Sequence, residues 1–218
     1  MMKQYFKIKE QNKDSILFFR LGDFYEMFYD DAKIASKELE LTLTGRDCGQ
    51  AERAPMCGVP FHSCEGYIAR LVAKGYKVAI CEQTEDPATA KGLVKRDIIR
   101  VITPGTVMES SMLDEGRNNY ICCMFSDSKK IGLCFCDIST GELYATEISG
   151  SDSVNSLTSQ LASYNPREIL IGGDIVKIKS LPAFIKSKLS AGVEMLRDES
   201  FDNKLCTDTV NMQFGEEM

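Results

Sequence analysis

Phe24 and Glu26 place an aromatic ring and a carboxylate two positions apart near the N-terminus. Residues 22–30 around them are short and aromatic enough to form a strand after a turn. On a strand, side chains two apart share one face. A stiff apolar ring can pry open a base step, and a carboxylate beside it can accept a hydrogen bond from the displaced base. The pair is therefore suited to probing a nucleic acid, although a core phenylalanine beside a solvated glutamate has the same spacing.

Other familiar reactive patterns are missing from the sequence. His62 is the only histidine, which excludes histidine-based triads and centres with several histidine ligands. There is neither a Cys-x-x-Cys pair nor a Gly-x-x-x-x-Gly-Lys-Ser/Thr phosphate loop. Cys48, Cys57 and Cys64 are irregularly spaced, so a zinc site is a minor alternative.

The cysteines and the apolar content indicate a globular protein with reduced thiols. The chain has 218 residues, 44% of them apolar, which is enough for one large or two ordinary domains. Its nine cysteines are odd in number and include the adjacent pair Cys122 and Cys123, so we expect small core residues rather than disulfides. No apolar run approaches the roughly 20 residues that span a bilayer, and the start lacks a signal peptide. We expect a cytoplasmic protein without membrane contact.

The net charge of −6 is unusual for a protein that binds a polyanion. The acidity lies mostly in the second half, because residues 1–117 carry 17 Lys and Arg against 18 Asp and Glu, whereas residues 118–218 carry 9 against 14. A local basic stripe consists of Lys91, Lys95, Arg96 and Arg100. A weakly charged first half should bind ordinary DNA duplex poorly.

The first half alternates between short strands and helices. We expect helices over 2–11, from an Asp30 cap to about Leu39, from a Ser63 cap to Lys74, and a short one from Asp86-Pro87. We expect strands over 15–20, 24–28, 41–44, 76–80 and 98–102. Residues 45–60 are rich in glycine, proline and polar groups and read as a long loop. The sum is an α/β domain with a mixed sheet.

Five collinear blocks in this half resemble the N-terminal mismatch-binding domain of the MutS DNA mismatch-repair proteins. The blocks are residues 17–32, 54–62, 78–83, 86–88 and 100–106. A weaker similarity at residues 137–141 points to the start of the connector domain that follows in that family. The resemblance implies a mismatch-binding domain over residues 1–115 and a connector domain over residues 116–218.

The second half reads as a ribonuclease-H-like α/β domain, the fold of the family's connector domain. Strands are expected over 120–125, 131–138 and 142–148 as an antiparallel set, followed by strands over 168–171 and 193–196. Helices are expected over 154–164 and 181–189. No closing helix is evident in the polar residues 200–218, so the chain could stop inside the domain.

That fold raises a second hypothesis, a metal-dependent nuclease, because ribonuclease-H-like enzymes hold two Mg²⁺ ions with clustered carboxylates. Asp137 lies on a strand where such a ligand could sit. The other acidic residues show no convergence with it; they are Asp127, Glu142, Glu147, Glu168 and Asp174. A fold does not imply its commonest chemistry. A non-catalytic interaction module is the third reading, and it should be indifferent to substitution of Phe24.

The resemblance assigns roles to six residues. Phe24 matches the family's wedge, which enters from the minor groove and stacks on the mispaired base. Glu26 matches the carboxylate that hydrogen-bonds to that base. Backbone or groove contacts to DNA are implied for Arg46, Met56, Lys95 and Arg96.

The resemblance also implies partners and cofactors. The expected partners are mismatched double-stranded DNA and, through the connector domain, a MutL-type repair protein. Full-length members are homodimers with an ATPase domain near the C-terminus that uses ATP and Mg²⁺. That domain is missing here, so we expect a chain that is not an enzyme, carries no cofactor of its own, is mostly monomeric and binds DNA more weakly than a complete homologue.

Overall fold

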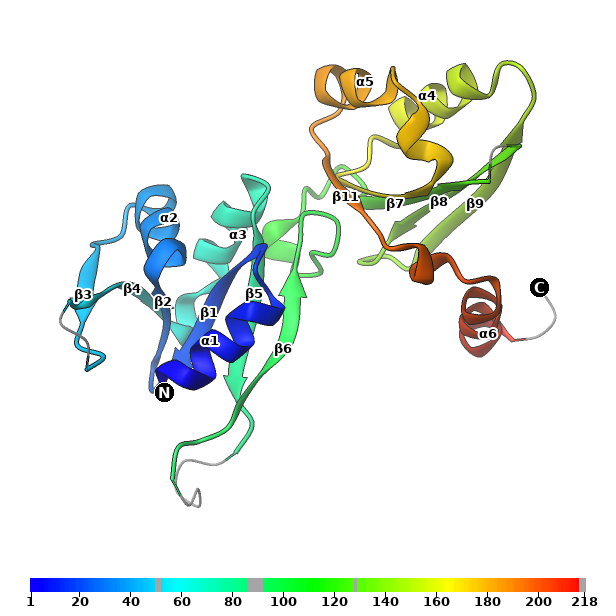
Figure 1. Ribbon diagram of the computed structural model, residues 1–218. Helices are drawn as coiled ribbons and strands as arrows, with labels where there is room; N and C mark the ends of the chain where they lie inside the picture. Colours follow the sequence, from blue (N-terminus) through cyan, green and yellow to red (C-terminus); the bar gives the residue numbers. More distant parts are fainter. Residues whose placement is uncertain (50–51, 86–91, 128, 216–218) are drawn as a thin grey trace. The chain divides into compact units, whose positions relative to one another are not determined.

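The chain folds into two compact units, each built on a mixed sheet (Figure 1). The computed structural model describes residues 1–49, 52–85, 92–127 and 129–215. Unit 1 is Met1–Pro104 and unit 2 is Gly105–Met218. The expected α/β class is confirmed for both. Across the described residues, no helix has the length and apolar character needed to cross a bilayer.

Unit 1 is a six-stranded sheet in the order β3-β4-β2-β1-β5-β6. The strands are β1 (Ser15–Leu21), β2 (Phe24–Phe28), β3 (Thr44–Arg46), β4 (Ala54–Pro60), β5 (Lys77–Gln83) and β6 (Arg96–Ile102). β1 pairs with β2 antiparallel and with β5 in parallel, which makes the sheet mixed. The strand predicted over residues 24–28 is confirmed at both ends.

Helices cover the two faces of this sheet unequally. They are α1 (Met2–Gln11), α2 (Tyr29–Leu39) and α3 (Glu65–Ala73). α2 packs on one face, where the Cys57 thiol donates to the carbonyl of Ala32, and α3 contacts α2. α1 lies on the other face, where Tyr5 and Ile8 join a buried cluster with Phe19 and Phe28.

Several local predictions for unit 1 were wrong. Residues 45–60 are not one loop, because Ala54–Pro60 forms β4, whose residues 56–60 pair with β2. Asp30 does not cap α2, which begins at Tyr29 after Phe28 with no side-chain cap. Likewise Ser63 lies in a 3-10 turn, and α3 begins at Glu65 after Cys64. The strand expected over 41–44 begins only at Thr44. The helix predicted at Asp86-Pro87 lies outside the described residues.

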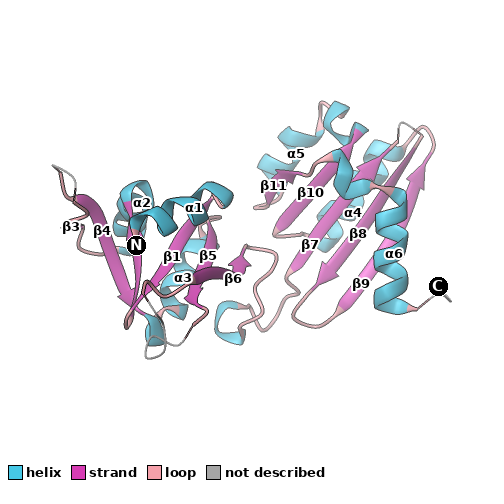
Figure 2. Cartoon of the chain, turned by 60° about the horizontal axis from the view of Figure 1, so that its bottom comes forward, coloured by secondary structure: helices cyan, strands magenta, loops and turns pink. Residues whose placement is uncertain are grey.

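Unit 2 is a five-stranded sheet in the order β11-β10-β7-β8-β9 (Figure 2). The strands are β7 (Tyr120–Ser126), β8 (Lys130–Asp137), β9 (Glu142–Ser149), β10 (Glu168–Gly173) and β11 (Gly192–Met195). β7, β8 and β9 form the expected antiparallel set, and β10 joins β7 and β11 in parallel. The predicted sequence of hairpin strands followed by strand and helix alternation is confirmed.

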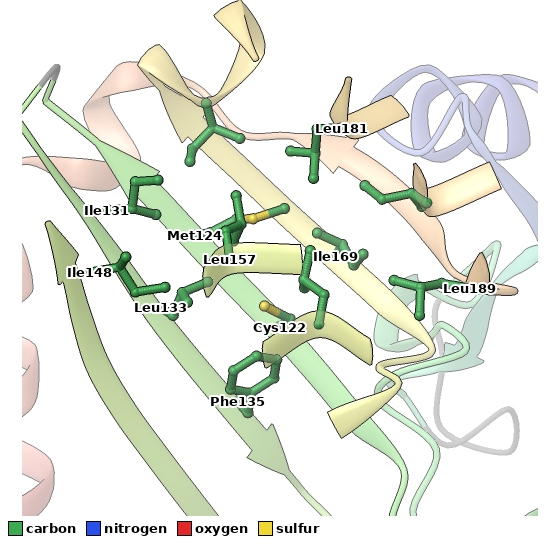
Figure 3. Packing of buried hydrophobic residues seen from close by; sticks show 13 residues of the cluster. Cys122, Met124, Ile131, Leu133, Phe135, Ile148, Leu157, Ile169, Leu181 and Leu189 are labelled. Carbon is green, nitrogen blue, oxygen red and sulfur yellow. The ribbon is translucent and has the colours of Figure 1, made fainter. Parts of the chain in front are cut away.

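One face of this second sheet carries the core of unit 2. Helices α4 (Ser153–Tyr164) and α5 (Leu181–Lys188) cover it. Figure 3 shows how their apolar side chains meet those of the strands, among them Cys122, Met124, Leu133, Phe135, Leu157 and Ile169. These side chains are at most 3% exposed. Burial on this scale stabilises a domain by about 25 cal/mol per Å² of apolar surface.

The C-terminal segment differs from the prediction. Residues 203–214 form a helix, α6 (Asn203–Phe214), although no closing helix was expected. The Asp202 carboxylate caps α6 by accepting the N–H of Leu205 at 2.9 Å.

All nine cysteines are free thiols, as predicted, and Cys57, Cys81 and Cys122 are buried. Cys206 is exposed on α6, so the prediction that the cysteines are core residues is wrong at this position.

Candidate nucleic-acid interface

Phe24 and Glu26 share one face of β2, as their spacing predicts. Tyr25, which lies between them, and Met27, which follows Glu26, point to the opposite face and are buried. Phe24 faces solvent with 47% of its surface exposed. Glu26 is partly buried, with 16% of its side chain exposed. The strand therefore displays an apolar ring at its tip and a carboxylate two residues behind it.

The exposure of Phe24 results from the limited reach of α1. Tyr5 on this helix packs edge-on against Phe19 and Phe28, with ring centroids 5.5 and 5.2 Å apart. Its hydroxyl donates to the Phe28 carbonyl at 3.2 Å. Phe28 at the end of β2 is fully buried, whereas Phe24 at its start lies beyond this cluster. On this face of the sheet, β2 therefore begins at an exposed phenylalanine and ends at a buried one.

Glu26 forms an ion pair with Arg46 across the sheet. Arg46 is on β3, Glu26 is on β2, and β4 lies between these strands. Gly58 of β4 is the register partner of Glu26, and a Cβ atom there would lie 3.2 Å from the Tyr25 carbonyl and 3.5 Å from Glu26 Cγ. A glycine at this position leaves room beside the carboxylate.

Met56 completes the set of residues on this face. It pairs with Phe28 of β2 and Thr44 of β3, and its side chain packs partly against the α1 cluster. Four of the six predicted site residues, namely Phe24, Glu26, Arg46 and Met56, therefore lie on the same face of three adjacent strands. Arg46 and Met56 lie on strands β3 and β4, so the prediction of a loop at their positions is wrong.

Phe61 also lies at this end of β2, although it is not among the predicted site residues. Its N–H donates to the Asp23 carbonyl at 3.0 Å, and its ring is 36% exposed. The Arg20 guanidinium lies 3.4 Å from the ring centroid, a close cation–π contact. The signal that could have found it is an aromatic residue directly after Pro60 inside a matched block.

The hydroxyl of Tyr25 supports the strand from the other face. It donates to the Glu82 carboxylate, which also forms an ion pair with Arg20 at 3.1 Å. Burial, and then the hydrogen bond to Glu82, raise the pKa of Tyr25 well above its usual value of 10.0. The phenol therefore stays protonated and keeps donating across the ordinary pH range.

Arg96 and Lys95 are arranged differently from the other predicted site residues. The Arg96 guanidinium donates to the carbonyls of Arg20 at 2.7 Å and Val94 at 2.8 Å, and to Gln4 at 3.3 Å. It also lies 5.2 Å from the Phe19 ring, and burial lowers its pKa. Lys95 is exposed and forms an ion pair with Glu85 at 3.2 Å. The geometry gives Arg96 a structural role, while Lys91 of the predicted stripe lies outside the described residues.

Asp137, the candidate nuclease carboxylate, is engaged by the backbone around it. It accepts the N–H groups of Asn119 at 2.8 Å and Ser139 at 2.9 Å, and the Ser139 hydroxyl at 2.6 Å. Burial alone would raise its pKa, but these hydrogen bonds lower it below the usual 3.8. Within the part of the chain that the structure describes, no three His, Cys, Asp or Glu side chains are placed to hold a metal ion. The carboxylate organises the turn between β8 and β9.

Comparison with known proteins gives matches along almost the whole chain. Residues 1–111 match the family model described as MutS domain I, and residues 119–218 match MutS domain II. A protein of Acetivibrio thermocellus named DNA mismatch repair protein MutS is 51% identical over 98% of this chain and 25% of its own length. Proteins of the same name from Ruminiclostridium cellulolyticum and Caldanaerobacter subterraneus are 55% and 56% identical over 93% and 81% of this chain. The chain spans about a quarter of the length of these relatives.

Proposed function

Because the chain belongs to the MutS family of DNA mismatch-repair proteins, we propose that unit 1 recognises mismatched or unpaired bases in double-stranded DNA. The observation that carries this proposal is the placement of Phe24, half exposed at the open end of β2 with Glu26 behind it on the same face. A wedge must be apolar, accessible and rigidly supported, and Phe24 meets all three conditions.

The proposed discrimination rests on the energy needed to deform the duplex. Phe24 enters from the minor groove and stacks on one base of a weakened step. Unstacking costs about a few kcal/mol per step, and the cost is lower where pairing is already defective. A kinked duplex is also easiest to bend where stacking is weak. Matched DNA therefore resists the wedge more than mismatched DNA does.

Glu26 supplies a second test in the proposed mechanism. An anion placed against DNA is unfavourable unless a base donor or a shared proton satisfies it. The ion pair with Arg46 offsets part of this charge before binding and fixes the direction of the carboxylate. Glu26 therefore acts on selectivity more than on affinity, and Arg46 acts through Glu26 as well as through the backbone of DNA.

Partners and cofactors are proposed from the resemblance to the longer MutS proteins. We propose that unit 2 serves as the connector that contacts a MutL-type protein. We also propose that dimer formation and the ATP- and Mg²⁺-dependent steps depend on parts of the family's proteins outside these 218 residues. On this proposal the chain itself is a non-enzymatic, mostly monomeric binding module that works on DNA in the cytoplasm.

Fluorescence anisotropy at low salt tests the central claim. The probes are a duplex with one G·T mispair, a duplex with one unpaired T, and the matched duplex. We expect the wild type to prefer the defective duplexes and Phe24→Ala to lose the preference. Phe6→Ala is the matched control, because Phe6 is also 47% exposed but lies on α1.

The outcomes separate the proposal from an interaction module. Equal binding of all three duplexes, unchanged in Phe24→Ala, would reject the wedge role. If affinity is too weak for anisotropy, an NMR titration at millimolar protein should still show chemical-shift changes at residues 22–28. These changes should appear at a lower concentration of mispaired duplex than of matched duplex. Shifts that cluster elsewhere, or that are the same for matched DNA, would also reject it.

A further inference from the structure

Unit 2 contains an apolar groove that the proposed function does not use. The groove lies between the sheet edge and α5 and has a volume of about 290 Å³. Its walls are almost wholly aliphatic and include Ile171, Val176, Ile178, Pro182, Ile185 and Val193. Val176 and Val193 are about half exposed at its rim, while Ile185 belongs to the buried core below. The groove is therefore an open, solvated continuation of the hydrophobic core.

The strand beside the groove, β11, is an edge strand with one free side. β11 is the outermost strand of the sheet: β10 lies on one side of it, and among the described residues no strand lies on the other (Figure 2). The N–H groups of Gly192 and Leu196 donate to carbonyls of Arg167 and Ile171 on the β10 side. Because backbone groups alternate in direction along a strand, Val193 and Met195 direct theirs to the free side. An added strand could pair with these groups.

The side chains of β11 relate this free edge to the groove. Val193 and Met195 pair with Ile169 and Ile171, so they share the face that α5 covers. They are 49% and 68% exposed, which is high for apolar residues on a core face. A strand paired with β11 would place alternate side chains over the same groove.

The charge around the groove is opposite to that of the rest of unit 2. Residues 174–189 contain four lysines and one aspartate, whereas residues 118–218 as a whole contain nine Lys and Arg against fourteen Asp and Glu. Lys186 lines the groove directly, and Lys177, Lys179 and Lys188 are exposed on the same segment. Only Lys177 has an ion pair with the aspartate, Asp174, among the contacts described for this segment. One lysine therefore lines the apolar groove, and three more are exposed on the segment that supplies much of its wall.

We propose that this groove and the free edge of β11 form a docking site for a short acidic segment of a partner protein, bound in an extended conformation. The partner's backbone pairs with Val193 and Met195, one of its apolar side chains fills the groove, and its carboxylates face the lysines. Strand addition to a sheet edge is a common mode of peptide recognition, in which backbone hydrogen bonds give affinity and pockets for alternate side chains give specificity. The groove is too small and too apolar for a nucleic-acid strand, which would need aromatic platforms and a continuous basic channel.

Peptide binding to the full 218-residue chain tests the proposal. The probe is the fluorescein-labelled peptide DEVLVFED, and its twin KKVLVFKK has the same apolar centre with reversed charge. We expect the acidic peptide to bind and its twin to bind at least about tenfold more weakly. Amide NMR shifts on titration should centre on residues 192–196 and 176–186.

Variants separate the two parts of the site. Lys186→Glu should weaken binding of the acidic peptide about fivefold or more, whereas Lys129→Glu, an exposed lysine change away from the groove, should not. Val193→Pro removes one outward N–H without touching the ladder to β10, and should weaken both peptides alike. Circular dichroism of each variant establishes that the fold is kept.

Each other result overturns the proposal. Equal affinity for both peptides would show that the lysines are not part of recognition. Absence of binding or of shifts at the groove at millimolar peptide would show that the groove is not a peptide site. Concentration-dependent shifts of the groove residues without peptide would show that a second copy of this chain is the occupant instead.

Discussion

Arg46 on β3 and Glu26 on β2 form an ion pair that crosses the intervening strand β4 and is only partly exposed. The two residues are twenty positions apart in the sequence, so this contact depends on the strand order. It holds the carboxylate that the proposed mechanism needs on the same face as the Phe24 ring. Its energetic weight can be measured in the absence of DNA.

A double-mutant cycle on this pair should show coupling in stability. We expect Glu26→Gln and Arg46→Gln each to lower the free energy of unfolding slightly, with a coupling of about 0.5–1 kcal/mol, because the pair is partly shielded from water. Urea unfolding of the two single variants and the double variant gives the coupling. A value near zero would mean that the ion pair does not restrain Glu26.

The same two variants should differ when DNA is present. Glu26→Gln should reduce the ratio of mismatched to matched affinity, since the carboxylate is the discriminating group in the proposed mechanism. Arg46→Gln should weaken binding to every duplex, since it removes a cation and leaves Glu26 uncompensated. Anisotropy with the three duplexes reads out both effects, and a uniform loss in Glu26→Gln would contradict the assignment.

Gly58→Ala should destabilise the protein, whereas Gly66→Ala should not. A Cβ at Gly58 would lie 3.2 Å from the Tyr25 carbonyl, so neighbouring atoms on β2 must move. We expect a loss of about 1 kcal/mol. Gly66 lies in α3 with open space around its Cβ position, and alanine there should stabilise the helix by up to about 1 kcal/mol. Thermal unfolding of both variants tests the pair, and equal effects would contradict it.

Gly173→Ala should be the more severe of two glycine changes in unit 2. Gly173 has φ of +59°, and a Cβ there would lie 2.3 Å from the Ser126 carbonyl. We expect a loss of at least about 2 kcal/mol from strain and displacement of the β7 end. Gly192→Ala is the control, because nothing lies within 4 Å of its Cβ position. Urea midpoints that shift equally would show that the β10 end can relax.

Asp137 should make stability depend on pH in the acidic range. Its hydrogen bonds lower its pKa in the folded state below the usual 3.8 despite burial. A carboxylate with a depressed pKa stabilises the fold above its unfolded pKa and loses that contribution as pH falls through the folded pKa. The stability difference between wild type and Asp137→Asn should therefore shrink between about pH 6 and about pH 2. Urea unfolding across this range tests it, and a constant difference would assign the effect to geometry rather than charge.

Elements with a clear period or a clean boundary could be predicted from the sequence. The strand at residues 24–28 and the helix at residues 2–11 are found with their predicted ends. β4 could not be found in this way, because Pro55, Gly58 and Pro60 interrupt the strand pattern. Pairing with β2 on one side and the short edge strand β3 on the other overrides those local signals.

The candidate site was predictable in part for a related reason. Phe24 and Glu26 depend only on strand alternation, which is local. The approach of Arg46 to Glu26 depends on three strands, and the inward turn of Arg96 depends on the Arg20 carbonyl, 76 positions away in the sequence. A run of basic residues does not reveal which of its members fold back into the protein.

The course of β2 from a buried end to an exposed end has a mechanical consequence. At Phe28 the strand is fully buried and anchored by the hydroxyl of Tyr5. Residues 24–26 pair with β1 on one side, and residues 24–28 pair with β4 on the other. A ring that parts stacked bases experiences an opposing push from the duplex. In the proposed mechanism, pairing on both sides of residues 24–26 transmits that push to the sheet and the core, so the DNA deforms rather than the strand. On the proposed mechanism, the depth to which Phe24 enters therefore depends on how easily the base step that it meets can be deformed.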